Sequence, residues 1–177
     1  NPDGRQMTGR AASESAVDIA IVGGGMVGVS LALLLSHLRL GWRIRIIESF
    51  PLQSNAALPP SFDGRSTALS HSSREIFELL GLWQSLDEGL TEIRQVHVSD
   101  RGHFGRTRLT AAEQNLPALG YVVENRQLGD VLMAALQRAP DVELTAPAQV
   151  AAVSPSSGGM QLQVSSDGTD AVEMISA

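Results

Sequence analysis

The sequence predicts an α/β fold whose N-terminal unit is a strand, a glycine-rich turn, a helix and a second strand. The first apolar run, 18–22, is rich in β-branched residues, which is typical of a parallel strand covered on both faces. Glycines follow it and open a long apolar stretch that suits a helix. A second apolar run, 43–47, ends in the acid Glu48. Strands that alternate with a helix predict a parallel sheet.

The turn after the first strand has the spacing G-x-G-x-x-G, formed by Gly23, Gly25 and Gly28. We expect Gly23 to allow the tight turn, Gly25 to let a diphosphate approach the backbone, and Gly28 to let the helix pack against the strand. The N-terminus of the helix would present free N–H groups and its positive dipole end to the diphosphate. The spacing therefore predicts a dinucleotide site.

Glu48 lies twenty positions after Gly28, where a carboxylate can accept hydrogen bonds from the ribose hydroxyls of an adenosine. An acid here disfavours a 2′-phosphate, so FAD or NAD is expected rather than NADP. Two other interpretations stay open: ordinary turn glycines, or a transmembrane helix over 19–38, which contains no Asp, Glu, Lys or Arg. Three consecutive glycines and Asp18 at its edge argue against a membrane span.

The composition is that of a soluble globular protein, with 177 residues, 43% hydrophobic and 18% charged side chains. A net charge of −6 gives no indication of a nucleic-acid surface. The absence of cysteine excludes disulfides, thiolate catalysis and thiolate metal ligands. The four histidines have no metal-site spacing, so no metal is expected. Residues 1–16 are polar and contain no secretory signal, and we expect a disordered leader.

The middle of the chain begins with a long connection, 49–65, rich in Pro, Ser and Asn. It ends in the turn sequence Phe62-Asp63-Gly64-Arg65. Ser66 is a good N-cap, and the apolar pattern behind it predicts a helix as far as Leu80, stopped by Gly81. A further short helix is expected over 82–90.

The second half is predicted to be mixed. Strands at 93–100 and 107–109 suggest a second sheet beside the nucleotide domain, and a strand at 121–124 leads into a helix capped by Asn125. The remaining apolar runs predict four strands, at 142–144, 148–153, 160–164 and 172–175. The expected domains are therefore a nucleotide domain, 17–90 with 120–177, and the start of a second sheet, 91–119.

Several segments together resemble the FAD-dependent aromatic hydroxylases of ubiquinone biosynthesis, a branch of the p-hydroxybenzoate-hydroxylase-like flavin monooxygenases. They are DIAIVGGGMVGVSLALLL, RIIES, SFDGRSTALS, LGLWQSL, VHVSDRGHFG and LGYVVENRQLGDVL, and with the strand pair after Pro140 they cover roughly 17–164 in order. The resemblance implies a Rossmann-like FAD-binding domain with part of a substrate-side β-sheet. The family's later Gly-Asp flavin motifs have no counterpart here, so the chain resembles only the N-terminal part of a hydroxylase.

The resemblance implies a set of FAD-binding residues and no catalytic side chain: Gly23, Gly25, Met26, Gly28, Glu48, Arg65, Arg126 and Val150. Arg65 would lie near the diphosphate and ribityl chain, Arg126 would also reach the FAD, and Val150 would offer backbone contacts near the adenine. Guanidinium groups suit phosphate. Alternatively, Arg65 is a solvated loop residue, and Arg126 is structural, although a cation in the first turn of a helix opposes the dipole unless an anion is present.

The same resemblance implies a reaction. NAD(P)H would reduce FAD, O₂ would give a flavin C4a-hydroperoxide, and this would hydroxylate a polyprenyl phenol. Other ubiquinone-biosynthesis proteins are expected partners, and the location would be cytoplasmic with peripheral contact to the inner membrane. Two alternatives remain, an FAD-dependent reductase or oxidase of another class and a non-catalytic nucleotide-binding fragment. Without the later motifs, we expect the fragment alone to be inactive.

The segment VHVSDRGHFG contains His97, Asp100 and His103, which could be an acid/base or metal set. Turn chemistry explains them as well, with His97 on a strand, a hairpin turn after it and His103 exposed. We favour the second interpretation.

Overall fold

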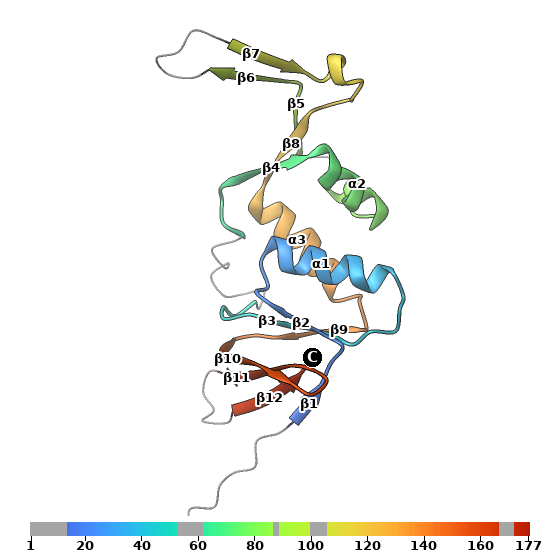
Figure 1. Cartoon of the computed structure of the whole chain (residues 1–177). Helices are drawn as coiled ribbons and strands as arrows, with labels where there is room; N and C mark the ends of the chain where they lie inside the picture. The colour runs from blue at the N-terminus through green and yellow to red at the C-terminus, as the bar shows by residue number, and fades with distance from the viewer. Residues whose placement is uncertain (1–13, 53–61, 87–88, 100–105, 167–171) are drawn as a thin grey trace, which may run out of the picture.

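The structure is a computed structural model that describes residues 14–52, 62–86, 89–99, 106–166 and 172–177. Its elements form successive layers along one long axis (Figure 1). A four-stranded sheet lies at one end, followed by a three-stranded parallel sheet, a pair of helices, a second three-stranded sheet and a two-stranded ribbon at the far end.

The predicted parallel sheet is confirmed. It has the order β2 (Ile19–Val22), β3 (Ile44–Ile47) and β9 (Val142–Thr145), with both pairs parallel. All four residues of β3 are buried, which explains why this central strand is apolar on both faces except at Arg45. Among the described strands, β2 and β9 are the two edges of this sheet.

Helices α1 (Met26–His37) and α3 (Asn125–Leu136) cover one face of the parallel sheet (Figure 1). Their buried residues include Val29 and Ala32 from α1 and Leu132 from α3, all 0% exposed. They join the larger hydrophobic core, which also takes in side chains of β2, β3 and β8. Within the described part of the chain, no helix is both long and apolar enough to span a bilayer.

The opposite face of the parallel sheet packs against the four-stranded sheet, in the order β1 (Glu14–Ala16), β12 (Val172–Ser176), β11 (Gly159–Ser166) and β10 (Ala148–Ser156). A smaller core fills the space between the two sheets. The prediction of a disordered leader is wrong for residues 14–16, because β1 pairs in parallel with β12. Residues 1–13 lie outside the described residues.

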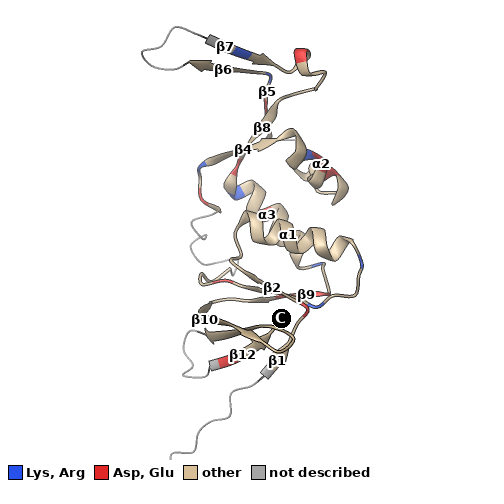
Figure 2. Ribbon diagram, in the orientation of Figure 1, with Lys and Arg blue, Asp and Glu red and all other residues tan. Residues whose placement is uncertain are grey.

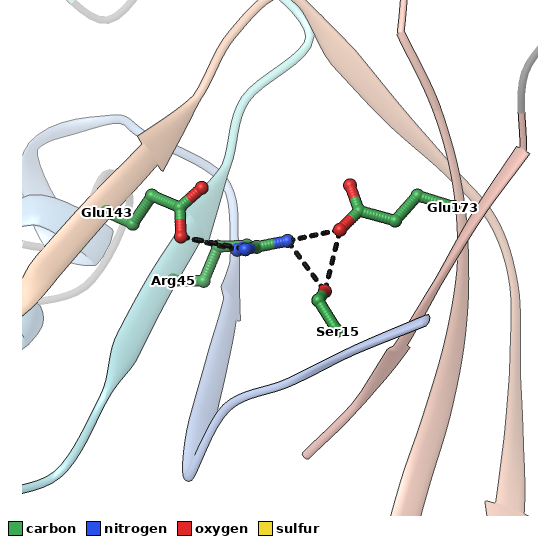
Figure 3. Close-up of polar contacts among 4 residues, drawn as sticks. All are labelled: Ser15, Arg45, Glu143 and Glu173. Carbon is green, nitrogen blue, oxygen red and sulfur yellow. Dashed lines mark hydrogen bonds and ion pairs between the residues drawn. The ribbon is translucent and has the colours of Figure 1, made fainter. Parts of the chain in front are cut away.

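One polar cluster joins these two sheets (Figure 3). Arg45, only 8% exposed, donates from Nη2 to Glu143 of β9 at 2.7 Å and from Nη1 to Glu173 of β12 at 2.7 Å. Ser15 of β1 donates to the same Glu173 carboxylate at 2.6 Å. The single polar residue of the central strand therefore connects three strands, and its buried charge is matched by two carboxylates.

Beyond the helices, the second sheet has the order β4 (Ser66–Ser70), β8 (Gly120–Glu124) and β5 (Thr91–Ile93), all antiparallel. The predicted helix from Ser66 is wrong over its first turn, because residues 66–70 pair with β8 along their whole length. The helix α2 (His71–Leu79) begins later, where the Ser70 hydroxyl accepts from the Ser73 amide at 3.1 Å. Gly81 follows its end with φ +69°, as expected for a helix stop.

The remaining elements extend this region. A short 3₁₀ helix, η2 (Trp83–Ser85), follows α2, and the ribbon of β6 (Gln95–Ser99) and β7 (Arg106–Thr110) projects from the second sheet before η4 (Ala112–Gln114) (Figure 1). The Arg74 guanidinium lies over the rings of Trp83 and Tyr121, at 5.2 and 5.3 Å from their centroids. This cation–π contact ties α2 and η2 to β8.

Candidate functional site

The glycine turn has the geometry that its sequence predicts. Gly23 has φ +111°, a conformation that side chains rarely adopt, and its amide donates to the Ile47 carbonyl at 2.8 Å. A Cβ at Gly28 would overlap the Gly23 carbonyl oxygen and would lie 3.3 Å from Cγ2 of Ile21. Close approach of α1 to β2 therefore requires glycine at position 28.

The turn delivers the chain into α1 with an open N-terminus. Gly25 is the N-cap, with φ −75° and ψ −174°, and no side chain among the described residues caps this end. The first turn contains no acidic residue. Met26 is the first helical residue, and it is partly buried against the main core. Uncapped N–H groups and an uncompensated positive dipole end suit an anionic group such as a diphosphate.

Glu48 lies directly beside this turn. Its Oε2 accepts from the Gly24 amide at 2.6 Å, and its Oε1 accepts from the Phe50 amide at 2.7 Å and the Ser49 hydroxyl at 3.1 Å. The residue is only 9% exposed. A carboxylate has about four acceptor positions, so three are used within the protein and Oε2 retains capacity for a ribose hydroxyl.

Gly24 belongs to the same candidate site, although the sequence alone did not single it out. A Cβ at this position would lie 2.9 Å from Cβ of Glu48 and 3.1 Å from Cδ1 of Leu52. The middle glycine of the triplet therefore lets the Glu48 carboxylate reach the turn. The sequence did contain a signal for this residue. Gly23 and Gly25 satisfy the spacing motif without Gly24, so a third glycine between them required another reason.

Val150 lies on β10, near the same edge of the site. Ala148, at the start of that strand, donates from its amide to the Glu48 carbonyl at 2.7 Å. Val150 is two residues further along, partly buried against the smaller core, and a register irregularity falls between it and Ala152. The structure thus connects the Glu48 backbone to the strand that carries Val150.

Arg65 lies at the end of the Phe62–Arg65 turn, immediately before β4. Its side chain is 73% exposed, and its Nε donates to Oδ2 of Asp63 at 2.6 Å. The Arg65 amide donates to the other carboxylate oxygen, Oδ1, at 3.0 Å. Asp63 therefore closes the turn and orients the guanidinium at the same time, a role that the sequence analysis read only as turn chemistry.

Arg126 lies in the first turn of α3, where it is 60% exposed and its Nε is 4.0 Å from the Glu124 carboxylate. The N-cap of α3 is Glu124, and Asn125 is the first helical residue, so the prediction that Asn125 caps the helix is wrong. Asn125 is instead 5% exposed and bonds to the Arg65 turn, which places Arg65 and Arg126 next to the same helix start.

These parts gather on one side of the molecule. The carboxyl end of β3, the beginnings of α1 and α3, and the start of β4 all lie on the left in Figure 1. In Figure 2 the Lys/Arg colour marks the starts of β4 and α3 on that side. The arrangement offers uncapped helix amides and a buried acid at one end and two exposed arginines at the other, a combination that fits a long ligand with a ribose and a diphosphate.

The histidine segment gives no support for a metal or acid/base site. His97 lies on β6, exposed, with its ring beside the Gln95 amide, which agrees with the strand prediction. Asp100 and His103 lie outside the described residues. The described residues contain no group of three or more His, Cys, Asp or Glu side chains arranged to hold a metal ion.

A family model described as an FAD binding domain matches residues 16–177. Ubiquinone hydroxylase UbiL of Rhodospirillum rubrum is 33% identical over 147 residues, which cover 83% of this chain and 33% of that protein. The 3-demethoxyubiquinol 3-hydroxylase of Escherichia coli is 36% identical over 138 residues, covering 77% of this chain and 34% of that protein. The chain thus spans about a third of the length of these relatives, and the resemblance seen in the motifs is confirmed.

Solved structures give the same fold. The flavin-dependent monooxygenase PieE, in complex with FAD and substrate, superposes with a TM-score of 0.69 at 19% identity, over 93% of this chain and 29% of that one. The p-nitrophenol 4-monooxygenase PnpA of Pseudomonas putida gives 0.68 at 17% identity, over 92% and 40%. These similarities show that the chain shares the fold of these proteins.

Proposed function

The chain belongs to the family of FAD-binding domains, and from this premise we propose that it is the FAD-holding, N-terminal portion of an aromatic-ring monooxygenase. The proposed substrate is a polyprenyl phenol of ubiquinone biosynthesis, hydroxylated with O₂ and with NAD(P)H as the reductant. The similarity to ubiquinone hydroxylases of two bacteria supports this substrate class. The narrower proposal, which rests on the motifs, is that the parent enzyme is similar to 2-octaprenyl-6-methoxyphenol hydroxylase.

The observation that carries the proposal is the contact between Glu48 and the glycine turn. The 2.6 Å bond from the Gly24 amide fixes the carboxylate beside the open N-terminus of α1, so an acceptor for ribose and donors for a diphosphate are held side by side. The residues present therefore fit FAD. When bound, FAD would supply the redox and oxygen chemistry, which amino-acid side chains do not provide.

The chain's own residues would hold and orient the cofactor. Gly23, Gly25 and Gly28 would shape the turn, and the amide of Met26, in the first turn of α1, would face the diphosphate. Glu48 would accept from the adenosine ribose. Arg65 and Arg126 would bind the phosphate and ribityl side of the cofactor. The backbone of Val150 would contact the adenine.

We expect the 177-residue chain to bind FAD saturably, measured by the change in flavin fluorescence during titration. Gly25→Val should abolish binding, because its side chain would block the approach to the helix amides. Gly25 has φ −75°, which valine also adopts, so circular dichroism should show the variant folded. A folded wild-type chain that binds NADH in preference to FAD would contradict the proposal and indicate a nicotinamide-nucleotide module.

A further inference from the structure

The Phe62–Arg65 turn is attached to α3 at both of its ends. The Phe62 ring, 1% exposed, packs on the helix where a Cβ at Gly129 would lie 2.6 Å from its Cδ1. The Arg65 carbonyl accepts from the Asn125 amide at 2.8 Å. The first two turns of α3 therefore form the surface on which this turn is held.

Asn125 makes the polar part of this attachment. Its Oδ1 accepts from the Thr67 hydroxyl at 2.6 Å, and its Nδ2 donates to Oδ1 of Asp63 at 3.3 Å. At 5% exposed it is, with Arg45 and Glu48, one of the buried polar residues in the described part of the chain. An amide is required for this pair of bonds, since it accepts at one atom and donates at the other, whereas a carboxylate only accepts and an aliphatic side chain does neither.

The bonds continue to the guanidinium. Oδ1 of Asp63 accepts hydrogen bonds from Nδ2 of Asn125 and from the Arg65 amide. Its Oδ2 accepts from Nε of Arg65 at 2.6 Å. A line of hydrogen bonds thus runs from Thr67 through Asn125 and Asp63 to Arg65. Since the Arg65 side chain is 73% exposed, core packing does little to fix its direction. The bond to Asp63 orients the guanidinium, and Asp63 is in turn held by Asn125.

We propose that Asn125 is a positioning residue for the cofactor: it holds Asp63 so that Arg65 points toward bound FAD. The proposal rests on the proposed function, because it assigns Asn125 to the same site. Asn125 itself touches no cofactor; it acts through Asp63 and Arg65. Preorganisation of this kind reduces the loss of side-chain entropy when an arginine binds its ligand.

The test is a double-mutant cycle on FAD affinity, with Asn125→Ala, Arg65→Gln and the pair. Asn125→Ala keeps the backbone bond to Arg65, so β4 and β8 should stay paired. We expect it to weaken FAD binding by about tenfold alone but by less than about threefold in the Arg65→Gln background, because both changes remove the same interaction. Additive losses would overturn the proposal. Gln137→Ala, at the other end of α3, is the control and should change nothing.

A second variant separates positioning from a general structural role. Asn125→Asp keeps the acceptor for Thr67 but sets a carboxylate against Asp63, so FAD binding should weaken near pH 8. Toward pH 5.5 the introduced carboxyl gains a proton that it can donate to Asp63, and affinity relative to the wild type should recover. An affinity deficit that does not change with pH would count against the proposal.

Hydrogen exchange of the Arg65 amide in the cofactor-free chain distinguishes failure of this inference from failure of the proposed function. That amide bonds to Asp63, so it should exchange faster in Asn125→Ala than in the wild type. Unchanged exchange shows that Asn125 does not hold the turn. A wild-type chain that does not bind FAD refutes the proposed function, and with it the assignment of Asn125 to a cofactor site.

Discussion

The two ends of the candidate site are built in different ways. At the glycine turn the groups proposed to face the ligand are backbone amides and one carboxylate that is 9% exposed and bonded to the turn itself. At the start of α3 they are the side chains of Arg65 and Arg126, 73% and 60% exposed. The first end is part of the core, so its shape exists only if the chain folds. The second end consists of exposed side chains on a backbone that other contacts hold in place, so these side chains can be replaced without loss of the fold.

This difference predicts that substitutions of the two packed residues at the glycine turn, Gly28 and Glu48, lower the stability of the fold, whereas substitutions of the exposed arginines act mainly on binding. Substitutions of Asn125 or Asp63, which lie between the two ends and connect the core to the surface, should lower both stability and FAD binding modestly. The following changes test that division, in order of decreasing effect.

Gly28→Ala should have the largest effect. The added methyl group would overlap the Gly23 carbonyl oxygen and force α1 away from β2. We expect a loss of about 3 kcal/mol or more in the free energy of unfolding, despite a gain of about 1 kcal/mol in helix propensity. Urea denaturation followed by circular dichroism measures it. Gly158→Ala, where an added Cβ meets nothing within 4 Å, is the matched control and should be neutral.

Glu48→Gln should come next. The carboxylate accepts from two backbone N–H groups and a hydroxyl. In glutamine an NH₂ group replaces one of the two oxygens, and it can only donate. We expect a loss of about 2 kcal/mol in unfolding free energy, together with weaker FAD binding. If stability is unchanged while FAD binding is lost, Glu48 belongs with the arginines and the division between the two ends is wrong.

Glu173→Gln should have a smaller effect that depends on pH. Partial burial acts to raise the pKa of Glu173, but hydrogen bonds from Ser15 and Arg45 and the charge of Arg45 outweigh it and hold the pKa below its ordinary value. A lowered folded-state pKa means that the stabilisation is complete above the ordinary value near 4.5 and is lost as the pH falls through the folded-state pKa.

We therefore expect Glu173→Gln to cost roughly 1 kcal/mol at neutral pH and to match the wild type in strong acid. Denaturation midpoints measured from neutral pH down through the acid range provide the check. The FAD affinity of this variant at neutral pH should equal that of the wild type, because the cluster of Ser15, Arg45, Glu143 and Glu173 connects sheets and not the cofactor site. A difference between wild type and variant that is the same at every pH would rule out this charge-based explanation.

Arg126→Gln should have the smallest effect on stability and a clear effect on binding. Its exposed ion pair with Glu124 contributes little, so the free energy of unfolding should change by less than about 0.5 kcal/mol. FAD binding should weaken about tenfold, which corresponds to about 1.4 kcal/mol. Arg94→Gln, at an arginine between β5 and β6 whose side chain is 78% exposed, is the control and should leave both quantities unchanged.

Sequence reasoning succeeded where the determining interactions are local. The glycine spacing, the apolar runs of β2 and β3 and the acid at position 48 lie within one βαβ unit, and the structure has them as expected. It failed where the partner is distant. β1 forms because residues 14–16 pair with β12, close to the other end of the sequence. The short polar segment itself contains no pattern that predicts this strand.

Two residues show why local patterns can mislead. Ser66 has the chemistry of an N-cap, but pairing with β8 over five residues outweighs that preference, and Ser70 takes the role instead. Asn125 also looks like a cap, yet its amide is buried against a turn some sixty residues earlier in the chain, as the 62-residue separation of its bond to Asp63 shows. Site residues that act through other residues leave no local signal.

The edge strand β2 has a consequence for handling the chain in solution. Among the described strands it pairs only with β3, and Val22 at its end is 62% exposed. An edge strand with unpaired backbone groups and apolar neighbours is a template for strands of other molecules. We therefore expect the isolated chain to self-associate as its concentration rises, and any binding measurement on it should be made dilute and checked for the monomer by light scattering.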